Sequence, residues 1–581
     1  MVQGDVGLEI GQRVATALHA ALGVTISPAD ALVRPSTRAG VDYQCNVAMS
    51  LAKTLGKPPR EVAQAIVDRL DSADLVEPPE LAGPGFINLV LSNDWLARRA
   101  TELLGDERIG VPRTTDPRRV AIDYGSPNVA KEMHIGHLRS SIIGDAIVRL
   151  LRFAGHDVTA HNHLGDWGTP FGMLIEHLID EGWGAGDASE HSISDLNSFY
   201  QAARKKFDAD PEFADRSRLR VVSLQSGDER TLALWQQLVD ESTAHFEKVY
   251  GLLGVLLRHE DLYGESFYNP YLADVVSELE GKGLTELSDG AVCVFPPGFT
   301  NREGDRLPLI IRKRDGGYGY AATDLATVRY WLGERNMTDL LYVVGTPQAQ
   351  HFTMVFAASR LAGWLGEQHR AVHVNFGTIL GADGKTIRTR AGGSVKLVEL
   401  LSEAIDNAAA VVAERSGLDP AEQRAVALSV GIGAVKYADL SNDREKDYIF
   451  TWEKMLAKEG NTSVYLQYAN ARIQSVLRRA GGQPADDTPI SVDAPAERAL
   501  VIKLLQLPAM FDSAVSGYAP HKLCTYLYET ATAFSGFYEN CPILAAETPR
   551  LRQSRLALAR LTSNVLVLGL SLLGIEAPAQ L

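Results

Sequence analysis

A strand, a helix and a second strand follow one another between residues 118 and 165, and this unit constrains the fold more than any other part of the sequence. The run RRVAIDYG (118–125) is rich in β-forming residues, a helical pattern covers about 136–154, and VTAHNHLG (158–165) predicts the second strand. Strands joined in this way through a helix lie parallel, with a right-handed crossover. The sequence therefore predicts an α/β fold built on a Rossmann-like, doubly wound parallel sheet.

The segments on either side of this unit predict a domain before it and an insertion after it. Residues 1–112 predict a small N-terminal α/β domain, in which 47–70 forms two helices interrupted by a pair of prolines and FINLVLS (86–92) forms a strand. Residues 180–260 have helical patterns and no strand signal. We expect them to form a helical insertion.

Strand signals return in the second half of the chain, and we expect them to complete the sheet. They are AVCVFPP (291–297), LPLIIRK (307–313), LLYVVG (340–345) and VHVNFGTIL (372–380). From Leu397 onward the pattern is almost purely helical, with apolar residues at i, i+3 and i+4. The sequence thus predicts three domains, at 1–112, 113–452 and 453–581, of which the last is all-helical.

Length, charge and cysteine usage exclude several classes of protein. The 581 residues exceed what one hydrophobic core serves. A net charge of −15 argues against a protein that coats itself with nucleic acid, although it leaves room for local basic patches. The four cysteines form no CxxC pair, which favours reduced thiols in a cytoplasmic protein without a zinc site. The first residues predict an amphipathic helix rather than a secretory leader, and the apolar run 565–575 is too short to span a bilayer, so we expect no membrane segment.

Two histidines and a lysine gather where the first predicted strand leads into the helix. In SPNVAKEMHIGHLRS (126–140), His134 and His137 stand around Gly136, and Lys131 precedes them. Positions i and i+3 share a face of the first helical turn, whose free N–H groups attract phosphate. Neutral imidazoles donate hydrogen bonds to phosphate oxygens, so the cluster suits charge that develops as pyrophosphate leaves. The four-residue pattern alone is equally consistent with one histidine that caps the helix and one that packs in the core.

SPNVAKEMHIGHLRS, followed by GDWGTPFGM (165–173), resembles the arginine-specific members of the class I aminoacyl-tRNA synthetases. The resemblance extends over nearly the whole chain, because further matches follow in order. They are DYQCN (42–46), AGPGFINL (82–89), GYAATDLA (319–326), YVVGTPQAQHF (342–352), EGNTSVYLQYANARI (459–473) and LLGIEAP (572–578). The resemblance implies ATP-dependent ligation of L-arginine to its tRNA through an arginyl-adenylate. It also implies an N-terminal tRNA-contacting domain, a class I Rossmann-type catalytic domain and a helical anticodon-binding domain.

In this family the two histidines of the first signature bind the phosphates of ATP and stabilise the transition state of amino-acid activation. The resemblance assigns this role to His134 and His137, while Gly136 would leave room for the adenosine. The chemical step is in-line attack of the arginine carboxylate on the α-phosphorus, in which positioning and electrostatic stabilisation supply most of the catalysis.

The second class I signature, a lysine-rich loop, departs from its pattern in this chain. The matching region is GADGKTIRTRAGG (381–393), where Thr389 replaces the usual catalytic lysine. The resemblance implies that Lys131 supplies the missing charge from its place just before the first signature. Lys385 and Arg388 are implied ATP contacts, although solvated charges on a glycine-rich loop are an equally good interpretation.

Recognition of arginine requires carboxylates placed to receive a planar, forked cation. By resemblance Asp123 and Asp324 fill this need, and Tyr320, four residues before Asp324, lies over the substrate. Taken alone, Asp324 could instead cap a helix, and Tyr320 could be a half-buried core aromatic. The residues implied to hold the amino and carboxylate groups of the substrate are Ser126, Asn128 and Gln348.

Contacts to tRNA are implied in both terminal domains. Tyr465, Tyr468 and Arg472 match positions of a helix that meets the anticodon, where aromatic rings stack on unpaired bases. The tyrosines could equally form a core stripe. Asn46 matches a residue that contacts the D-loop corner, although Val41 replaces the usual glycine before it.

The predicted function is therefore arginine--tRNA ligation, with ATP and Mg²⁺, tRNA for arginine and L-arginine as partners. No zinc and no membrane are expected, and a monomer is the family default. The alternatives are a class I synthetase for cysteine or glutamine, a small-molecule nucleotidyltransferase with the same histidine motif, and a non-catalytic tRNA-binding relative. Cysteine recognition usually uses zinc, and glutamine offers no cation for two carboxylates.

Overall fold

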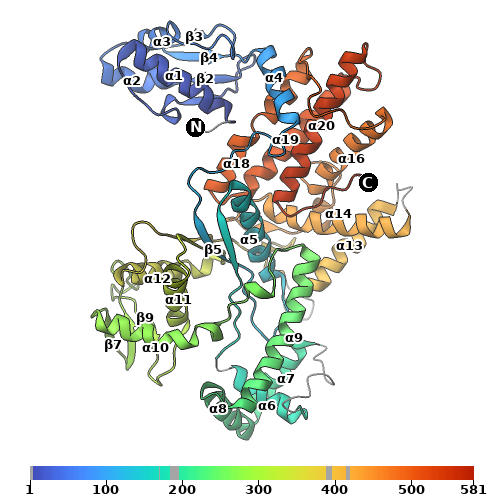
Figure 1. The fold of residues 1–581 in the computed structure, drawn as a ribbon. Helices are drawn as coiled ribbons and strands as arrows, with labels where there is room; N and C mark the ends of the chain where they lie inside the picture. The colour runs from blue at the N-terminus through green and yellow to red at the C-terminus, as the bar shows by residue number, and fades with distance from the viewer. Residues whose placement is uncertain (1–3, 169, 184–194, 388–394, 414–418) are drawn as a thin grey trace. The chain divides into compact units, whose positions relative to one another are not determined.

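The computed structural model describes residues 4–168, 170–183, 195–387, 395–413 and 419–581. It divides into two compact units, whose elements are labelled in Figure 1. Unit 1 comprises Met1–Arg113, Ala457–Ser571 and Glu576–Leu581, and unit 2 comprises Thr114–Leu456 and Leu572–Ile575. Both ends of the chain thus belong to unit 1, while a short segment near the C-terminus belongs to unit 2.

Unit 2 is built on a parallel four-stranded sheet. In spatial order its strands are β11 (Arg370–His373), β10 (Asp339–Tyr342), β5 (Arg119–Asp123) and β6 (Asp157–His161). Helix α5 (Ile135–Ala154) connects β5 to the parallel β6, so the predicted strand–helix–strand unit is confirmed. The register pairs Asp123 with His161 on one side and with Tyr342 on the other. The carboxyl ends of these three strands therefore meet at one edge.

Two of the four predicted strands in the second half belong to a different sheet, so this part of the prediction is wrong. The runs 340–345 and 372–380 supply β10 and β11, but 291–297 and 307–313 do not join them. Instead β7 (Thr285–Ser288), β8 (Ala291–Val294) and β9 (Leu309–Arg312) form an antiparallel sheet. Asp289 and Gly290, both with positive φ, close a two-residue turn between β7 and β8. Such turns join antiparallel neighbours, whereas a parallel strand needs a crossover.

The hydrophobic core of unit 2 lies between the sheet and the helices that cover it. These helices are α10 (Glu265–Gly281), α11 (Tyr320–Arg329), its π-helical continuation Tyr330–Glu334, and α12 (Ala349–Leu361). Ala121 of β5 and Leu340 of β10 share this core with Val275, Leu325 and Val355 from the three α-helices. Short 3₁₀ turns stand at His259–Asp261 and Thr346–Gln348.

The described residues of the predicted insertion are helical. They form the end of α6 (Pro170–Asp180), α7 (Leu196–Ala209), α8 (Pro211–Gln225) and α9 (Glu229–Leu253), which Figure 1 shows gathered in one group. The last three helices each begin at an aspartate whose side chain accepts backbone N–H groups of the first turn, at Asp195, Asp210 and Asp228. These aspartates therefore mark in the sequence where the three helices begin.

The remainder of unit 2 is helical apart from one pair of short strands. It contains α13 (Leu397–Ala413), α14 (Pro420–Leu440), α15 (Trp452–Met455) and the parallel pair β12 (Ile379–Leu380) with β13 (Tyr448–Ile449). The helical pattern predicted from Leu397 onward is thus confirmed, with β13 as the exception.

A buried charged cluster receives the C-terminal segment of unit 2. The Asp145 carboxylate lies 2.8 Å from Arg149 Nε and 3.7 Å from Lys436 Nζ, and the Lys436 ammonium also donates to the Leu253 carbonyl at 2.9 Å. Gly574 stands against this cluster with φ +67°, and a Cβ there would lie 2.6 Å from Lys436 Nζ. Only glycine fits this position without displacement.

The N-terminal part of unit 1 is the predicted α/β domain. Its antiparallel strands are β1 (Val33–Pro35), β2 (Tyr43–Cys45), β4 (Phe86–Leu89) and β3 (Glu80–Ala82). Its helices are α1 (Val6–Leu22), the 3₁₀ turn Ala29–Ala31, α2 (Val47–Leu55), α3 (Pro59–Val67) and α4 (Asn93–Leu104). Pro59 is the first residue of α3, which confirms the two helices separated by prolines.

The C-terminal part of unit 1 is all-helical. It contains α16 (Ser463–Ala480), α17 (Pro495–Leu504), α18 (Leu507–Ser516), α19 (Pro520–Asn540) and α20 (Pro549–Leu572). By length and composition, two segments of the described chain could cross a membrane, Pro495–Ser516 and Pro549–Leu572, and 44% and 67% of their apolar windows are buried. Buried residues such as Leu561, Val565 and Leu566 on α20 are those of a helix packed in a protein core.

Candidate active site

The loop between β5 and α5 carries the candidate site at the carboxyl edge of the sheet, where ligands of open α/β sheets bind. Ser126 and Ala130 have positive φ angles of 47° and 60°, which turn the loop sharply. The Ser126 N–H donates to Asn162 Oδ1, and its hydroxyl donates to Asp123 Oδ1, both at 2.9 Å. The loop is therefore held in one conformation by its own hydrogen bonds.

Asn128 is exposed on this loop, beside the GDWG segment. It forms a parallel bridge with Gly165, and the Val129 N–H donates to the Gly165 carbonyl at 3.0 Å. A Cβ on residue 165 would lie 2.2 Å from Asn128 Oδ1. Gly165 is thus required for the close approach that holds Asn128 in place.

Both predicted histidines lie in the first turn of α5, with ring centroids 4.1 Å apart. His134 Nδ1 accepts the Gly136 N–H at 3.0 Å, and His137 Nδ1 accepts the His134 N–H at 3.1 Å. A neutral imidazole whose Nδ1 accepts a hydrogen bond carries its proton on Nε2. Both rings therefore present an Nε2–H donor. His134 does cap the helix, as the alternative interpretation expected, but capping occupies only Nδ1.

Burial keeps both imidazoles neutral. It lowers the pKa of His137 to about 3, and burial together with the Lys131 charge lowers the pKa of His134. A Cβ on residue 136 would lie 2.8 Å from His134 Cε1, so Gly136 makes room for the histidine ring itself. The Lys131 ammonium lies 4.5 Å from the centroid of the Tyr200 ring, on α7. The turn thus combines a cation with two neutral hydrogen-bond donors.

The loop that departs from the second signature is described only in part. Lys385 is exposed after a turn in which the Gly381 N–H donates to the Lys385 carbonyl at 2.7 Å. Arg388 and Thr389 lie outside the described residues. Where the description resumes, the Ile135 N–H donates to the Val395 carbonyl at 3.1 Å, and the Leu397 N–H donates to the Met133 carbonyl at 2.9 Å. The far end of this loop is therefore paired with the histidine turn.

The two predicted arginine-binding carboxylates interact electrostatically. Burial raises the pKa of Asp123 to about 6, opposed by His163 and the Ser126 hydroxyl and reinforced by the Asp324 charge. Asp324 lies inside α11, whose N-cap is Gly319, so the interpretation of Asp324 as a helix cap is wrong. The physical reason is that α11 begins one turn earlier, at Tyr320.

Asp324 has a partner that the sequence did not reveal. His351, on α12, approaches Asp324 Oδ2 with its Nε2 at 2.6 Å, and this hydrogen bond raises the pKa of His351. His351 follows Gln348 by three residues, within the quoted motif YVVGTPQAQHF, so the motif itself was the available signal.

A third carboxylate was also missed. Glu265 is the first residue of α10, and burial raises its pKa to about 7, with His163 opposing the rise and Asp166 and Asp324 adding to it. In a sequence, an acid in the first turn of a helix indicates only a favourable interaction with the helix dipole. In the structure the charges of Asp166 and Asp324 act on Glu265. The Asp324 charge thus acts on both Asp123 and Glu265, and these three carboxylates, called the acidic pocket below, favour a cation.

The remaining predicted arginine contacts lie at the ends of nearby elements. Tyr320 begins α11 and is 77% exposed, so the interpretation of Tyr320 as a core aromatic is wrong. Its position four residues before Asp324 in one helix places both on the same face. Gln348 is exposed in the 3₁₀ turn that precedes α12.

The predicted tRNA-contacting residues lie in unit 1. Tyr465 is half-buried, with its ring 5.7 Å from that of Tyr528, and Tyr468 on the same helix is also half-buried. Arg472 is exposed, with its guanidinium 5.5 Å from the ring of Tyr538. This face of α16 therefore combines packed aromatic rings with an exposed cation.

Asn46 precedes α2 in the N-terminal domain. Its Oδ1 is buried and has no hydrogen-bond partner among the residues that the structure describes. A buried amide oxygen without a partner is costly, and the cost is relieved when a donor reaches it.

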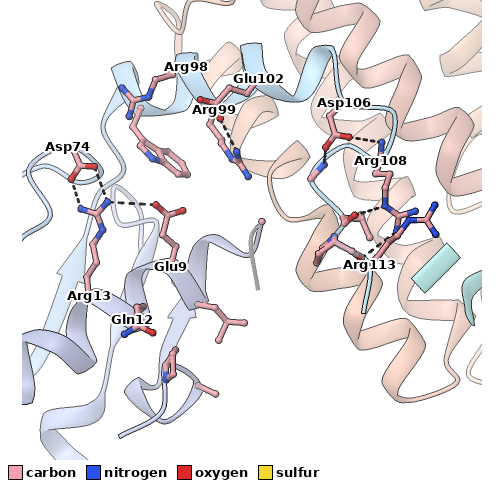
Figure 2. Close-up of a pocket in the computed structure, with 18 of the residues that line it drawn as sticks. Glu9, Gln12, Arg13, Asp74, Arg98, Arg99, Glu102, Asp106, Arg108 and Arg113 are labelled. Carbon is pink, nitrogen blue, oxygen red and sulfur yellow. Dashed lines mark hydrogen bonds and ion pairs between the residues drawn. The ribbon is translucent and has the colours of Figure 1, made fainter. Parts of the chain in front are cut away.

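Unit 1 also contains a cavity of about 1170 Å³, which Figure 2 shows in close-up. Its wall pairs Arg13 with Asp74 and Glu9, and Arg99 with Glu102 at 2.8 Å. Because these guanidiniums are compensated within the wall, they offer little free charge to an anion. None of the predicted site residues within the described part of the chain lines this cavity.

Metal ligands do not gather in the described part of the chain. No group of three or more His, Cys, Asp or Glu side chains is arranged to hold a metal ion there. The four cysteines are buried free thiols.

Comparison with known families accounts for nearly the whole chain. Residues 99–452 match the family described as tRNA synthetases class I (R), catalytic domain, residues 466–581 match the DALR anticodon binding domain, and residues 8–91 match the arginyl tRNA synthetase N terminal domain.

Individual relatives agree with these families. The arginine--tRNA ligase of Thermobifida fusca is 52% identical over 98% of this chain and 99% of its own length. The crystal structure of arginyl-tRNA synthetase from Plasmodium falciparum is 28% identical, with a TM-score of 0.85 over 100% of both chains. Thermus thermophilus arginyl-tRNA synthetase is 26% identical, with a TM-score of 0.79 over 99% of this chain and 100% of that one.

Proposed function

The chain belongs to the arginine-specific class I aminoacyl-tRNA synthetases, and from this premise we propose that the His134–His137 turn and the acidic pocket beside it form its active site. The activity of the family is the ATP-dependent joining of arginine to its tRNA, and it is the activity of this chain. The observation that carries the proposed site is the pair of half-buried, neutral imidazoles that both carry an Nε2–H at the start of α5.

These donors suit the first chemical step. An oxygen of the arginine carboxylate attacks the α-phosphorus of ATP, the bond to the β-phosphate oxygen breaks, and pyrophosphate leaves with the arginyl-adenylate retained. His134 and His137 donate hydrogen bonds to the phosphate oxygens as their charge grows, while neither ring has to gain or lose a proton. In the second step the 3′-terminal adenosine of the tRNA attacks the acyl carbon through a ribose hydroxyl, and AMP leaves.

Lys131 completes the phosphate site in this proposal. Its charge acts on both imidazoles, which supports a place beside the reacting phosphate. It stands in for the lysine that Thr389 replaces. Lys385 and Arg388 are proposed as further ATP contacts.

The acidic pocket takes the arginine side chain. Asp123 and Asp324 receive the guanidinium, and Glu265 adds a third negative charge. Bound arginine stabilises the ionised forms of Asp123 and Glu265, which burial disfavours. The contacts proposed for the rest of the substrate are Tyr320 over its side chain, and Ser126, Asn128 and Gln348 at its amino and carboxylate groups.

Recognition of tRNA is proposed on both parts of unit 1. Tyr465, Tyr468 and Arg472 meet the anticodon loop, where stacking and phosphate contact combine. Asn46 is proposed to contact the D-loop corner. We retain the domain boundaries 1–112, 113–452 and 453–581.

Mg²⁺ is proposed to enter with ATP, held by its phosphates and water, because Mg²⁺ in such sites keeps few protein ligands. A monomer in the cytoplasm is proposed for the whole protein.

The decisive experiment is ATP–pyrophosphate exchange measured with each amino acid, with and without tRNA. We expect exchange with arginine alone, and only when tRNA is present. Exchange with cysteine or glutamine would overturn the specificity, and exchange with no amino acid would indicate a non-catalytic relative. Exchange with arginine in the absence of tRNA would overturn only the tRNA requirement.

A further inference from the structure

We infer that Tyr200, on helix α7 of the insertion, is a positioning residue for the catalytic step, because its ring holds the Lys131 ammonium beside the two imidazoles. This inference rests on the proposed role of Lys131. The Lys131 Nζ lies 4.5 Å from the centroid of the Tyr200 ring, well within the range of a cation–π contact.

The positioning has a physical purpose. A lysine side chain has four rotatable bonds and a compact charge, so it loses considerable entropy when it is fixed in one place. An aromatic face attracts the ammonium without neutralising it, whereas a carboxylate would form an ion pair and reduce the charge available to phosphate. Tyr200 therefore restrains Lys131 and leaves its charge available.

A second set of contacts holds α7 in the correct place for this role. Lys396 Nζ lies 2.8 Å from Glu132 Oε2 and 3.3 Å from Asp195 Oδ2. Glu132 is the neighbour of Lys131, and Asp195 is the N-cap of the helix that bears Tyr200. The ion pairs thus join both partners of the cation–π contact through one lysine.

Lys396 also belongs to the segment that returns from the 381–393 loop. It forms an antiparallel bridge with His134, and the flanking backbone of residues 395 and 397 pairs with that of residues 133 and 135. The insertion, the returning loop and the histidine turn therefore meet at one junction. A displacement of α7 at this junction would therefore move the Tyr200 ring relative to the Lys131 ammonium.

The contact between Tyr200 and Lys131 can be tested with one variant that removes the aromatic ring and one that retains it. Tyr200→Leu should lower kcat for arginine- and tRNA-dependent ATP–pyrophosphate exchange about tenfold, the size expected of a partly desolvated cation–π contact, while the KM for ATP and for arginine change less than about twofold. Tyr200→Phe retains the ring face and should retain kcat. Tyr200→Gln tests the same loss with a polar side chain at this half-buried position, should the leucine variant fold poorly.

A matched control is available on the same helix. Phe199 stacks on His177 with ring centroids 4.9 Å apart, so Phe199→Leu removes a neighbouring aromatic ring that contacts a different partner. It should lower thermal stability and leave kcat unchanged. If Tyr200→Phe and Phe199→Leu both lowered kcat as much as Tyr200→Leu, Tyr200 would serve only the integrity of the helix, and the inference would be wrong.

A graded series separates electrostatics from packing. Phenylalanine with one, two or three ring fluorines at position 200 keeps the shape but weakens the negative face of the ring. The logarithm of kcat should fall with each fluorine, and a flat series would overturn the inference.

Lys131→Ala distinguishes failure of this inference from failure of the proposed active site. We expect it to lower kcat by orders of magnitude, and Tyr200→Leu should add nothing in that background. Additive losses in the double variant would show that Tyr200 acts elsewhere, which would overturn the inference alone. Wild-type activity of Lys131→Ala would overturn the proposed role of Lys131 and the inference with it.

Discussion

In each imidazole of the histidine turn, Nδ1 accepts a backbone N–H and Nε2 carries the proton. Because Nδ1 of His134 and of His137 both accept N–H groups, the tautomer is determined before any nucleotide arrives. Desolvation then prevents protonation at neutral pH. The backbone contacts of His134 and His137 therefore fix the tautomer that their proposed role at a phosphate requires.

Asp123 has the opposite property, because burial disfavours its charged form. Burial raises the pKa of Asp123 from 3.8 to about 6, so this group favours the folded state below pH 4 and loses that contribution as the pH rises through 6. Two pKa units correspond to about 3 kcal/mol. We expect Asp123→Asn to stabilise the ligand-free protein at pH 7.5 by up to that amount.

The measurement for this prediction is the free energy of urea unfolding of both proteins at pH 7.5 and pH 4.5. The gain from Asp123→Asn should shrink at the lower pH, where the wild-type carboxyl is protonated in the folded state. An equal gain at both values would mean that the ionisation of Asp123 is not the cause.

Asp324 leads to a kinetic prediction. Asp324→Asn removes one charge-assisted partner of the guanidinium, so the KM for arginine should rise about 10- to 100-fold while the KM for ATP stays nearly constant. Steady-state exchange kinetics give both constants. Asp274→Asn, an exposed carboxylate on α10, is the control and should change neither. A rise in both KM values for Asp324→Asn would indicate a general loss of structure instead.

At the scale of elements, a buried ion pair joins α5 to α14. Arg139 Nε lies 3.2 Å from Asp439 Oδ2, and both side chains are almost completely buried. The guanidinium also lies between the rings of Phe376 and Tyr448, at 5.7 and 5.3 Å. The helix that carries the histidines is therefore anchored one turn after them, near its N-terminal end.

Removal of one partner should be costly, because it leaves an uncompensated buried charge. We expect Arg139→Met to lower the free energy of unfolding by about 3–5 kcal/mol, and the double variant with Asp439→Leu to recover much of the loss. Denaturant unfolding monitored by circular dichroism measures both. The exposed pair Arg204 with Asp208 is the control, and Arg204→Ala should cost about 0.5 kcal/mol or less. No recovery in the double variant would contradict the electrostatic explanation.

Local patterns predicted most elements, and failures occurred where local patterns were ambiguous. The strands at 118–125 and 158–165 and the helix between them were predicted because their periods differ clearly. The assignment of 291–297 to the parallel sheet is wrong because a short apolar run does not indicate which strand it pairs with. Asp289-Gly290, just before this run, is the sequence signal of an antiparallel hairpin.

The proposed site residues likewise differ in whether the sequence identifies them. The resemblance identified Asp123, three residues before one quoted motif, and Asp324, within another. Glu265 could not be found from sequence, because only the fold brings the start of α10 to the pocket. The tautomers of His134 and His137 likewise depend on backbone N–H directions that no pattern contains.

At the scale of the whole molecule, substitution of Gly574 tests whether the C-terminal segment 572–575 stabilises unit 2. Its φ of +67° and its contact with the Lys436 cluster make alanine unfavourable on two counts. Gly574→Ala should lower the free energy of unfolding by about 2–3 kcal/mol, since backbone strain and a buried overlap add. Gly283→Ala has the same φ of +67° with nothing within 4 Å and should cost about 1 kcal/mol. Calorimetry of both variants tests this, and equal losses would exclude a role for the cluster.

The segment Leu572–Ile575 has a consequence for biosynthesis. A ribosome makes the chain from one end, and the catalytic unit lacks the residue that seats on Lys436 until position 574 has been translated. Unit 1 likewise stays incomplete until the helices after residue 457 have been translated. A nascent chain that stops before residue 574 therefore lacks part of both units, and we expect both to be less stable than in the full-length protein.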